Sequence, residues 1–561
     1  MIRRFPEHRL RPVTDLRGVW DFVFLGDAGP EAVAPGDLAF DDLAAVPGSW
    51  DATPRYAGRR GLAAYRTRVP VSRPGRHRLI LDGLHHWARV WANGQPVGDH
   101  AGGFTRVAFD MESGDAAEAE IVVLTDNRID YDRAPTHLHY FDWYHFGGLT
   151  RGGEWQALGD AWIDSLRVDT LDHEARRLRV RLTLAGDSGG PRPLSLRFQG
   201  QEILRRDAEV AGEPVEVVHE FEASEADLWS PANPALHHLE ARFGDDDLNE
   251  RVGIRTVSVK GRDISLNGEP LRLRGFNRHE GHPQFGHGQP DQLLITDLQL
   301  LEDMGCNFVR GSHYPQDVRF LDLCDERGIL VWNEGTAWQQ TAAHLTDEHY
   351  LTVAERNLTE MVADAANRPC VILWGLLNES ESQVAASRSG YERLIRHLRA
   401  LDATRPVTFA TNHPFDDRCL DLADVVSINT YPGWYTGPIK EIPERLIEIT
   451  DYLDAQPGAQ GKPFILSEIG AGGIPGWRDW NQGRWTETYQ ARLLETVVGH
   501  VNRPGGRWMG LAIWQFCDVR TTEWTAKALG RPRAFNNKGV VDEYRRPKEA
   551  YAVVRKGFTE G

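Results

Sequence analysis

The sequence predicts a multi-domain protein that joins an all-β jelly-roll sandwich, an immunoglobulin-like β-sandwich and a C-terminal (β/α)8 TIM barrel. The chain of 561 residues is too long for one hydrophobic core. Its first part holds short runs of alternating apolar and polar residues, whereas after Gly261 apolar strands alternate with helical patterns. We expect boundaries that divide the chain into residues 1–165, 166–258 and 259–561.

The first predicted sandwich is built from runs in which apolar and polar residues alternate. Clear examples are Gly18–Phe24, Ala64–Pro70 and Trp87–Ala92. Asn93-Gly94 follows the last run and favours a tight hairpin, because both residue types tolerate a positive φ. The domain ends in an aromatic run, residues 139–148, around Asp142. This run is either a loop that leaves its own domain or a packed aromatic corner.

The second predicted domain also contains strands only. Leu178–Leu184 and Leu239–Phe243 alternate cleanly between apolar and polar residues. A span of about ninety residues without a helical pattern is typical of an immunoglobulin-like sandwich. The segment holds no motif that carries chemistry.

The third region contains eight candidate strands with helical patterns between them. The strand candidates are Leu271–Gly275, Asn307–Arg310, Ile329–Trp332, Val371–Trp374, Val407–Ala410, Val425–Ile428, Phe464–Ser467 and Leu511–Trp514. Helices fit between them at Pro290–Met304 and Val318–Arg327. Eight such units predict a closed parallel barrel, whose active site is built at the carboxyl ends of the strands.

Two of these strands end in a glutamate. The fourth strand candidate runs on through apolar residues to Asn378 and Glu379, and the seventh leads directly to Glu468. Two carboxyl groups on one rim of a barrel suit the cleavage of a glycosidic bond, with one as acid and base and the other as nucleophile. We expect a separation of about 5–5.5 Å and a raised pKa at Glu379, which follows an apolar strand. The alternative is that each glutamate caps the following helix.

Composition and net charge argue against some classes of binding partner. A net charge of −17 argues against nucleic acid and anionic membranes as partners, and no apolar run approaches membrane-spanning length. The first residues show no signal peptide, and the five cysteines are few and widely spaced. We therefore expect a cytoplasmic protein that acts on a small-molecule or oligosaccharide glycoside, without a cofactor, and a homo-oligomer is left open.

The motifs at the strand ends resemble those of glycoside hydrolase family 2. They are Gly275–Glu280, Arg310–Pro315, Trp374–Glu379 and Ser467–Gly470. The resemblance covers the whole chain, including the order of the three domains. It implies that Glu379 is the acid/base, that Glu468 is the nucleophile, and that the anomeric configuration is retained. It further implies that Asn378 holds the sugar 2-hydroxyl group, and that the glycone is bound by His279, Arg310, His313, Tyr431 and Trp514.

Within this family the sequence is similar to the β-glucuronidases. Asn429–Tyr435 is similar to one of their runs, and Asn536–Gly539 matches the Asn-x-Lys pattern that binds a uronate carboxylate. Asp142 matches the aspartate that their first domain sends into the active site. The resemblance implies that Asn536 and Lys538 select a β-hexuronide, most of all a β-D-glucuronide.

Three departures from the β-glucuronidase pattern leave related glycones open. The segment between Glu334 and His344 is short, Pro432 stands where an aromatic residue is usual, and Arg531 and Arg533 do not align cleanly. The open glycones are β-galacturonides, β-galactosides, galactofuranosides and arabinofuranosides.

Two further functions compete with this interpretation. His279, Glu280, His282 and His287 cluster after the first barrel strand, as ligands of a metal hydrolase do, but their spacing is not His-Glu-x-x-His. We therefore expect no catalytic metal, although similarity to β-galactosidases leaves a bound cation near Glu280 open. A non-catalytic sugar-binding protein is the other alternative, and the two strand-end glutamates argue against it.

Overall fold

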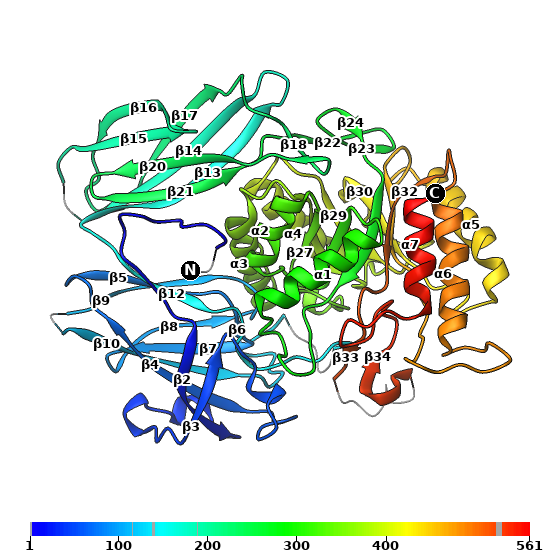
Figure 1. Ribbon diagram of the computed structural model, residues 1–561, viewed down its shortest axis with the longest axis horizontal. Helices are drawn as coiled ribbons and strands as arrows, with labels where there is room; N and C mark the ends of the chain where they lie inside the picture. The colour runs from blue at the N-terminus through cyan, green and yellow to red at the C-terminus, as the bar shows by residue number, and fades with distance from the viewer. Residues whose placement is uncertain (1–2, 115, 137–140, 188, 523–529, 561) are drawn as a thin grey trace.

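The computed structural model describes the chain except for residues 1–2, 115, 137–140, 188, 523–529 and 561. Two β-sandwiches lie side by side on one flank of a barrel, and the N-terminus lies between them (Figure 1). The barrel closes from eight parallel strands, as the sequence predicts. No helix among the described residues combines the length and apolar character that crossing a membrane requires.

The first sandwich consists of two antiparallel sheets. One sheet has the order β1 (Val13–Asp15), β12 (Gly153–Ala157), β5 (Arg76–Leu81) and β9 (Val107–Glu112). The other has the order β3 (Asp42–Val46), β2 (Gly18–Gly26), β4 (Leu62–Pro70), β10 (Glu118–Asp126), β7 (Trp87–Ala92) and β8 (Gln95–Ala101). Asn93 and Gly94 join β7 to β8 with φ values of 50° and 76°, so the predicted tight hairpin forms. The jelly-roll connectivity stays a prediction.

The second sandwich is also antiparallel. Its sheets have the orders β13 (Ala161–Asp172), β14 (Arg177–Gly186), β17 (Val215–Glu222), and β16 (Gln201–Ala208), β15 (Arg192–Phe198), β20 (His237–Phe243), β21 (Asp246–Val252). Strand β13 pairs with β14 from Ala161 onward. The domain boundaries at residues 165 and 258 stay predictions.

The barrel carries all eight predicted strands in sequence order. They are β25 (Leu273–Arg278), β26 (Phe308–Gly311), β27 (Leu330–Glu334), β28 (Val371–Asn378), β29 (Val407–Thr411), β30 (Val425–Asn429), β31 (Phe464–Glu468) and β32 (Trp508–Ile513). The helices are α1 (Asp291–Asp303), α2 (Val318–Arg327), α3 (Glu348–Ala365), α4 (Arg388–Leu401), α5 (Ile442–Ala455), α6 (Glu487–Val501) and α7 (Glu549–Thr559). Asp317 caps the start of α2, and Gly328 ends it at φ 73°, where glycine has no Cβ to strain.

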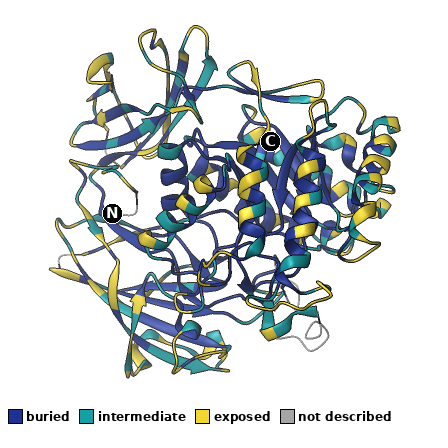
Figure 2. Ribbon diagram, turned by 45° about the vertical axis from the view of Figure 1, so that its right-hand side comes forward, coloured by how far each residue is buried: buried dark blue, intermediate teal, exposed yellow. Residues whose placement is uncertain are grey.

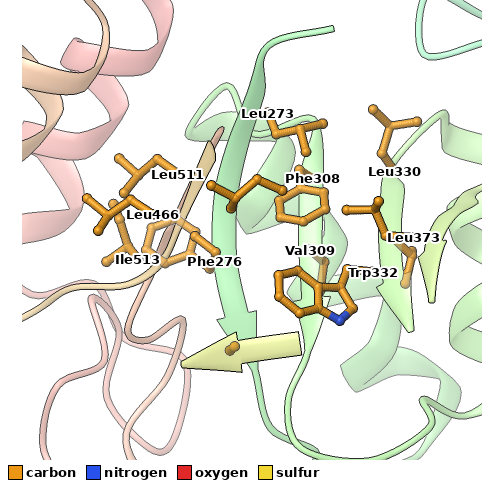
Figure 3. Close-up of a cluster of buried hydrophobic side chains, with 14 of the residues drawn as sticks. Leu273, Phe276, Phe308, Val309, Leu330, Trp332, Leu373, Leu466, Leu511 and Ile513 are labelled. Carbon is orange, nitrogen blue, oxygen red and sulfur yellow. The ribbon is translucent and has the colours of Figure 1, made fainter. Parts of the chain in front are cut away.

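Apolar side chains of the strands form the largest core of the molecule. Phe276, Phe308, Trp332 and Leu373 come from four neighbouring strands and gather in one cluster (Figure 3). The barrel strands are almost entirely buried, whereas several of the helices around them, α6 and α7 among them, have an exposed outer face (Figure 2). Burying one large apolar side chain contributes about 1.5–3 kcal/mol, so this layer holds the strand ends rigidly in place.

Small sheets of two or three short strands lie in the segments between the large sheets. Around the junction of the second sandwich with the barrel these are β18 (Trp229–Ser230) with β19 (Asn233–Pro234), and β22 (Val257–Lys260) with β23 (Asp263–Leu266) and β24 (Glu269–Pro270). The pairs β6 (Leu84–His85) with β11 (Gly148–Leu149), and β33 (Val519–Arg520) with β34 (Phe535–Asn536), flank the segments that carry Asp142 and Arg531.

Candidate active site

A pocket of about 470 Å³ opens at the carboxyl ends of the barrel strands. Both strand-end glutamates line it, and so do residues from the first domain. The lining includes Asp142, Trp143, His313, Gln339, Glu379, Asn429, Tyr431, Tyr435, Glu468, Trp514, Arg531 and Lys538. The structure therefore brings most of the predicted site residues into one cavity, from segments up to about four hundred positions apart.

Glu468 ends β31 at the bottom of the pocket and is 3% exposed. One carboxylate oxygen accepts a hydrogen bond from Arg310 Nη1 at 3.0 Å, and the other accepts one from the Tyr431 hydroxyl at 2.7 Å. Burial, together with the charge of Glu379, raises the pKa of Glu468 to about 8, although Arg310 and Tyr431 act in the opposite direction. Arg310 and Tyr431 thus stabilise the ionised carboxylate, whereas burial and the charge of Glu379 favour the protonated form.

Glu379 follows β28 directly and adopts a left-handed backbone conformation, with φ 48°. Its carboxylate accepts hydrogen bonds from Asn429 Nδ2 at 3.1 Å and from Gln339 Nε2 at 3.2 Å. Both donors are uncharged amides, in contrast to the guanidinium that holds Glu468.

The two glutamates differ in depth. Glu468 is buried, whereas Glu379 is half-buried at the pocket wall. Burial is the main cause of the raised pKa of Glu468, and the charge of Glu379 adds to it. The expectation of a raised pKa at Glu379 stays a prediction.

Asn378 lies between the two glutamates as the last residue of β28. Its Oδ1 accepts hydrogen bonds from Arg310 Nη2 at 2.7 Å and from Asn429 Nδ2 at 3.0 Å. These two donors fix the orientation of the amide. The Nδ2 group is buried and has no partner among the described residues. Asn378 is not among the residues that line the pocket, so its contact with the sugar 2-hydroxyl group stays a prediction.

Two aromatic layers form the wall beside Glu468. The His313 ring stacks on Trp514 with centroids 5.2 Å apart, and its Nδ1 lies 2.9 Å from Glu334. His279 lies behind this wall, stacked on Trp143 at 5.1 Å, and its Nδ1 is 3.1 Å from the Tyr314 hydroxyl. The structure does not bring His279 to the pocket surface, and its role in substrate binding stays a prediction.

Lys538 is 3% exposed, follows β34 and lines the pocket. Its Nζ donates to the Tyr435 hydroxyl at 3.0 Å and lies over the rings of Tyr431 and Trp434, at 5.7 and 5.8 Å from their centroids. No carboxylate of the described residues pairs with this ammonium group, and burial lowers its pKa.

The aromatic run of the first domain crosses to the barrel, so it is a loop that leaves its own domain. Asp142 accepts hydrogen bonds from Arg531 Nε at 2.6 Å and from Asn536 Nδ2 at 3.0 Å, and it also pairs with Arg531 Nη2. His145 Nδ1 lies 3.1 Å from the Thr522 hydroxyl. The first two residues of the run, His139 and Tyr140, lie outside the described residues. Asn536 thus uses a donor on Asp142, which the sequence did not indicate.

The histidine cluster after the first barrel strand serves structural contacts. Glu280 accepts hydrogen bonds from Arg151 Nη2 at 2.8 Å and from the Asp317 N–H at 2.7 Å, and His287 Nδ1 contacts the Glu280 carbonyl. Within the described part of the chain, no three His, Cys, Asp or Glu side chains lie close enough to hold a metal ion.

Sequence reasoning missed several contacts of the pocket. Gln339 lies in the short segment after β27 and supports Glu379, and Arg531 neutralises Asp142. Residues 412–416, which follow β29, and Arg445 of α5 also line the pocket. The available signal was the polar run Asn412-His413 at the end of the fifth strand, because every strand end in this fold faces the same rim.

Comparisons with known proteins agree with this geometry. The family model for the TIM barrel domain of glycosyl hydrolases family 2 matches residues 257–560. The β-glucuronidase of Rattus norvegicus is 28% identical over 521 residues, which are 86% of this chain and 78% of that protein.

Solved structures resemble the whole chain. A family 2 β-galacturonidase from Eisenbergiella tayi, bound to galacturonate, has a TM-score of 0.93 and 32% identity, and the match covers 100% of this chain and 99% of that one. A β-D-glucuronidase from Dictyoglomus thermophilum has a TM-score of 0.84 and 26% identity, with 98% and 97% covered. The chain belongs to glycoside hydrolase family 2 and is a glycoside hydrolase.

Proposed function

We propose that this chain is a retaining, exo-acting β-hexuronidase. The observation that carries the proposal is Lys538, a buried ammonium group in the pocket without a carboxylate partner among the described residues. Leaving such a group desolvated is costly, and a C6 carboxylate of the substrate would compensate for it. A neutral hexose would leave the charge unpaired, so the pocket selects against it.

In the proposed mechanism the two glutamates divide the work. Glu379 donates its proton to the glycosidic oxygen as the bond to the anomeric carbon breaks, and the Glu468 carboxylate attacks that carbon from the other face. Glu379, now ionised, then takes a proton from water, whose oxygen displaces Glu468 and releases the sugar with its configuration retained.

Neighbouring groups support each step of this mechanism. The guanidinium of Arg310 and the Tyr431 hydroxyl stabilise the charge of Glu468 while it is the nucleophile and again when it leaves. The free Nδ2 of Asn378 donates to the 2-hydroxyl group of the sugar, where hydrogen bonds strengthen in the transition state. The Asp142 loop lines the same pocket as Lys538 and favours a terminal sugar.

The configuration at C4 separates two candidate substrates. The sequence motifs favour a β-D-glucuronide, and the glucuronidases of several organisms align with most of the chain. A β-D-galacturonide is the second candidate, favoured by the similarity of the whole chain to the Eisenbergiella tayi galacturonidase.

The remaining predictions about the chain concern its surroundings. A reducing, cytoplasmic location is favoured by five buried free cysteines. The expected absence of nucleic acid and membrane partners, and the possibility of a homo-oligomer, stay predictions.

The test compares substrates that differ only at C6. We expect Lys538→Met to lower kcat/KM for the p-nitrophenyl β-hexuronide by roughly a hundredfold or more, because a desolvated ion pair is lost. The same variant should change kcat/KM for the matching hexoside by less than roughly threefold. Lys440→Met, an exposed lysine outside the pocket, is the control.

An equal loss on both substrates would contradict the proposal. So would a wild-type enzyme that prefers a neutral hexoside or a furanoside to both hexuronides. Measuring kcat/KM for the p-nitrophenyl β-glucuronide and the p-nitrophenyl β-galacturonide in parallel shows which configuration at C4 the enzyme prefers.

A further inference from the structure

The pocket has an inner and an outer half with different chemistry. The inner half is formed by Lys538, Trp514 and the Asp142 loop. We call the outer half, residues 412–416 with Thr436 and Arg445, the outer wall. The outer wall follows β29, next to β28, which ends at Glu379. Because an acid/base must reach the leaving oxygen, the side of the pocket next to Glu379 faces the aglycone.

The pocket has room for more than the glycone. Its volume of about 470 Å³ lies within the range of about 300–1,000 Å³ that holds drug-sized ligands, which are larger than one sugar ring. The outer wall therefore contacts the group that is attached to the glycone.

The only carbocyclic aromatic ring among the outer-wall residues is already covered. The guanidinium of Arg445 lies over the Phe415 ring, 4.6 Å from its centroid. The edge of that ring meets Tyr452 at a centroid distance of 5.0 Å, and the Tyr452 hydroxyl donates to the Phe415 carbonyl. Phe415 also packs against the barrel core and is only partly exposed, so it supports Arg445 rather than serving as a platform for a flat aglycone.

Most of the other outer-wall residues carry hydrogen-bonding side chains, and these include a cation, Arg445, and an anion, Asp416. Arg445 uses Nη1 on Glu448 at 2.6 Å, which leaves further N–H groups of the guanidinium for a ligand. His413 lies 3.4 Å from the Asp416 carboxylate, and the Asp416 side chain is 64% exposed. A guanidinium and a carboxylate on one wall match the donors and acceptors of vicinal hydroxyl groups better than they match an apolar ring or an anion.

From this arrangement we infer that the outer wall is a binding subsite for a second, neutral sugar, so that the natural substrate is an oligosaccharide that ends in a β-hexuronide. Arg445 and Asp416 are its specificity-determining residues. The inference rests on the proposed hexuronidase function and names the aglycone class of that same site.

The experiment measures a ratio: kcat/KM for a disaccharide with the preferred β-hexuronide on galactose, divided by kcat/KM for the matching p-nitrophenyl hexuronide. We expect Arg445→Gln to lower this ratio by roughly tenfold or more, because charge-assisted hydrogen bonds to sugar hydroxyls are lost. Asp416→Asn should lower the ratio in the same direction. The control is Arg399→Gln, a similarly exposed helical arginine paired with Asp424 at 2.7 Å outside the pocket.

The possible outcomes distinguish a failure of the subsite from a failure of the proposed hexuronidase function. A ratio that stays within twofold of wild type in both outer-wall variants would overturn the subsite, while cleavage of the p-nitrophenyl hexuronide would leave the proposed function standing. A wild type that cleaves neither hexuronide but cleaves a neutral glycoside would overturn the proposed function, and the subsite assignment with it. A normal melting temperature in the variants shows that the change in ratio does not come from misfolding.

Discussion

Two clusters of buried charge in this molecule differ in how completely they are paired. The first lies where the N-terminus, the second sandwich and the barrel meet. There Arg3 contacts Asp322 at 3.2 Å, Glu250 at 3.1 Å and Glu7 at 2.8 Å. Burial opposes ionisation of Asp322, but the charges of Arg3, Arg368 and Arg251 outweigh it and hold its pKa below the ordinary value.

The second cluster is the pocket, where the pairing is incomplete. Burial and the charge of Glu379 raise the pKa of Glu468 to about 8, and burial lowers the pKa of Lys538. At the junction the folded protein itself satisfies each charge, so the cluster holds domains together. In the pocket the compensation is incomplete. Lys538 has no carboxylate partner among the described residues, and the pKa of Glu468 stays raised although Arg310 and Tyr431 donate hydrogen bonds to it.

The largest expected effect comes from removing one of the two pocket glutamates. Glu468→Ala should reduce turnover by at least about 10⁴-fold, because the attacking group is gone. Added azide should restore part of the activity and give a glycosyl azide of inverted configuration. Glu379→Ala with azide should instead give the retained product, since its nucleophile remains. Product stereochemistry by NMR checks the assignment, and exchanged outcomes would reverse the two roles.

The next largest effect comes from removing a buried charge where the N-terminus, the second sandwich and the barrel meet. Arg3→Ala should lower the free energy of unfolding by about 3–5 kcal/mol, because it removes the cation that contacts Asp322, Glu250 and Glu7 together and leaves these buried carboxylates with less compensation. Calorimetry should show a lower Tm, while kcat of the folded enzyme stays at the wild-type value. A matched control is Arg17→Ala, which removes an ion pair to Asp15 that is about one-third exposed. An equal loss of stability in both variants would show that burial of the pair adds nothing.

The smallest effect compares the pH dependence of the two clusters. Glu468 has a folded pKa of about 8 against an ordinary value of 4.5, so it destabilises the fold increasingly as pH rises between those values. Glu468→Gln should therefore gain a few degrees in Tm over wild type at pH 8 and almost none at pH 4.5.

Asp322 should behave in the opposite way. Its pKa is lowered from 3.8, so its contribution is present above that value and is lost as the pH falls below it. The Tm deficit of Asp322→Asn should be largest near neutral pH and shrink in acid. Thermal scans across this range check both trends, and parallel curves for the two variants would remove the contrast.

Local sequence patterns are enough to predict the barrel and the positions of its polar strand ends. Apolar runs followed by Asn378-Glu379 and by Glu468 are local patterns, and the parallel fold then requires that they face one rim. The resemblance to a known family also led to Asp142 and Lys538, which the structure brings into the same pocket.

The compensation of these charges, in contrast, cannot be read from local patterns, because it depends on contacts between distant segments. Asp142 and Arg531 are 389 positions apart in the chain, so no local pattern could reveal that they pair, or that Lys538 has no carboxylate partner within the described part of the chain. The raised pKa of Glu468 likewise depends on its depth of burial and on the charge of Glu379 nearby. Pairing and burial are properties of distances in space, and the folded arrangement of the domains sets those distances.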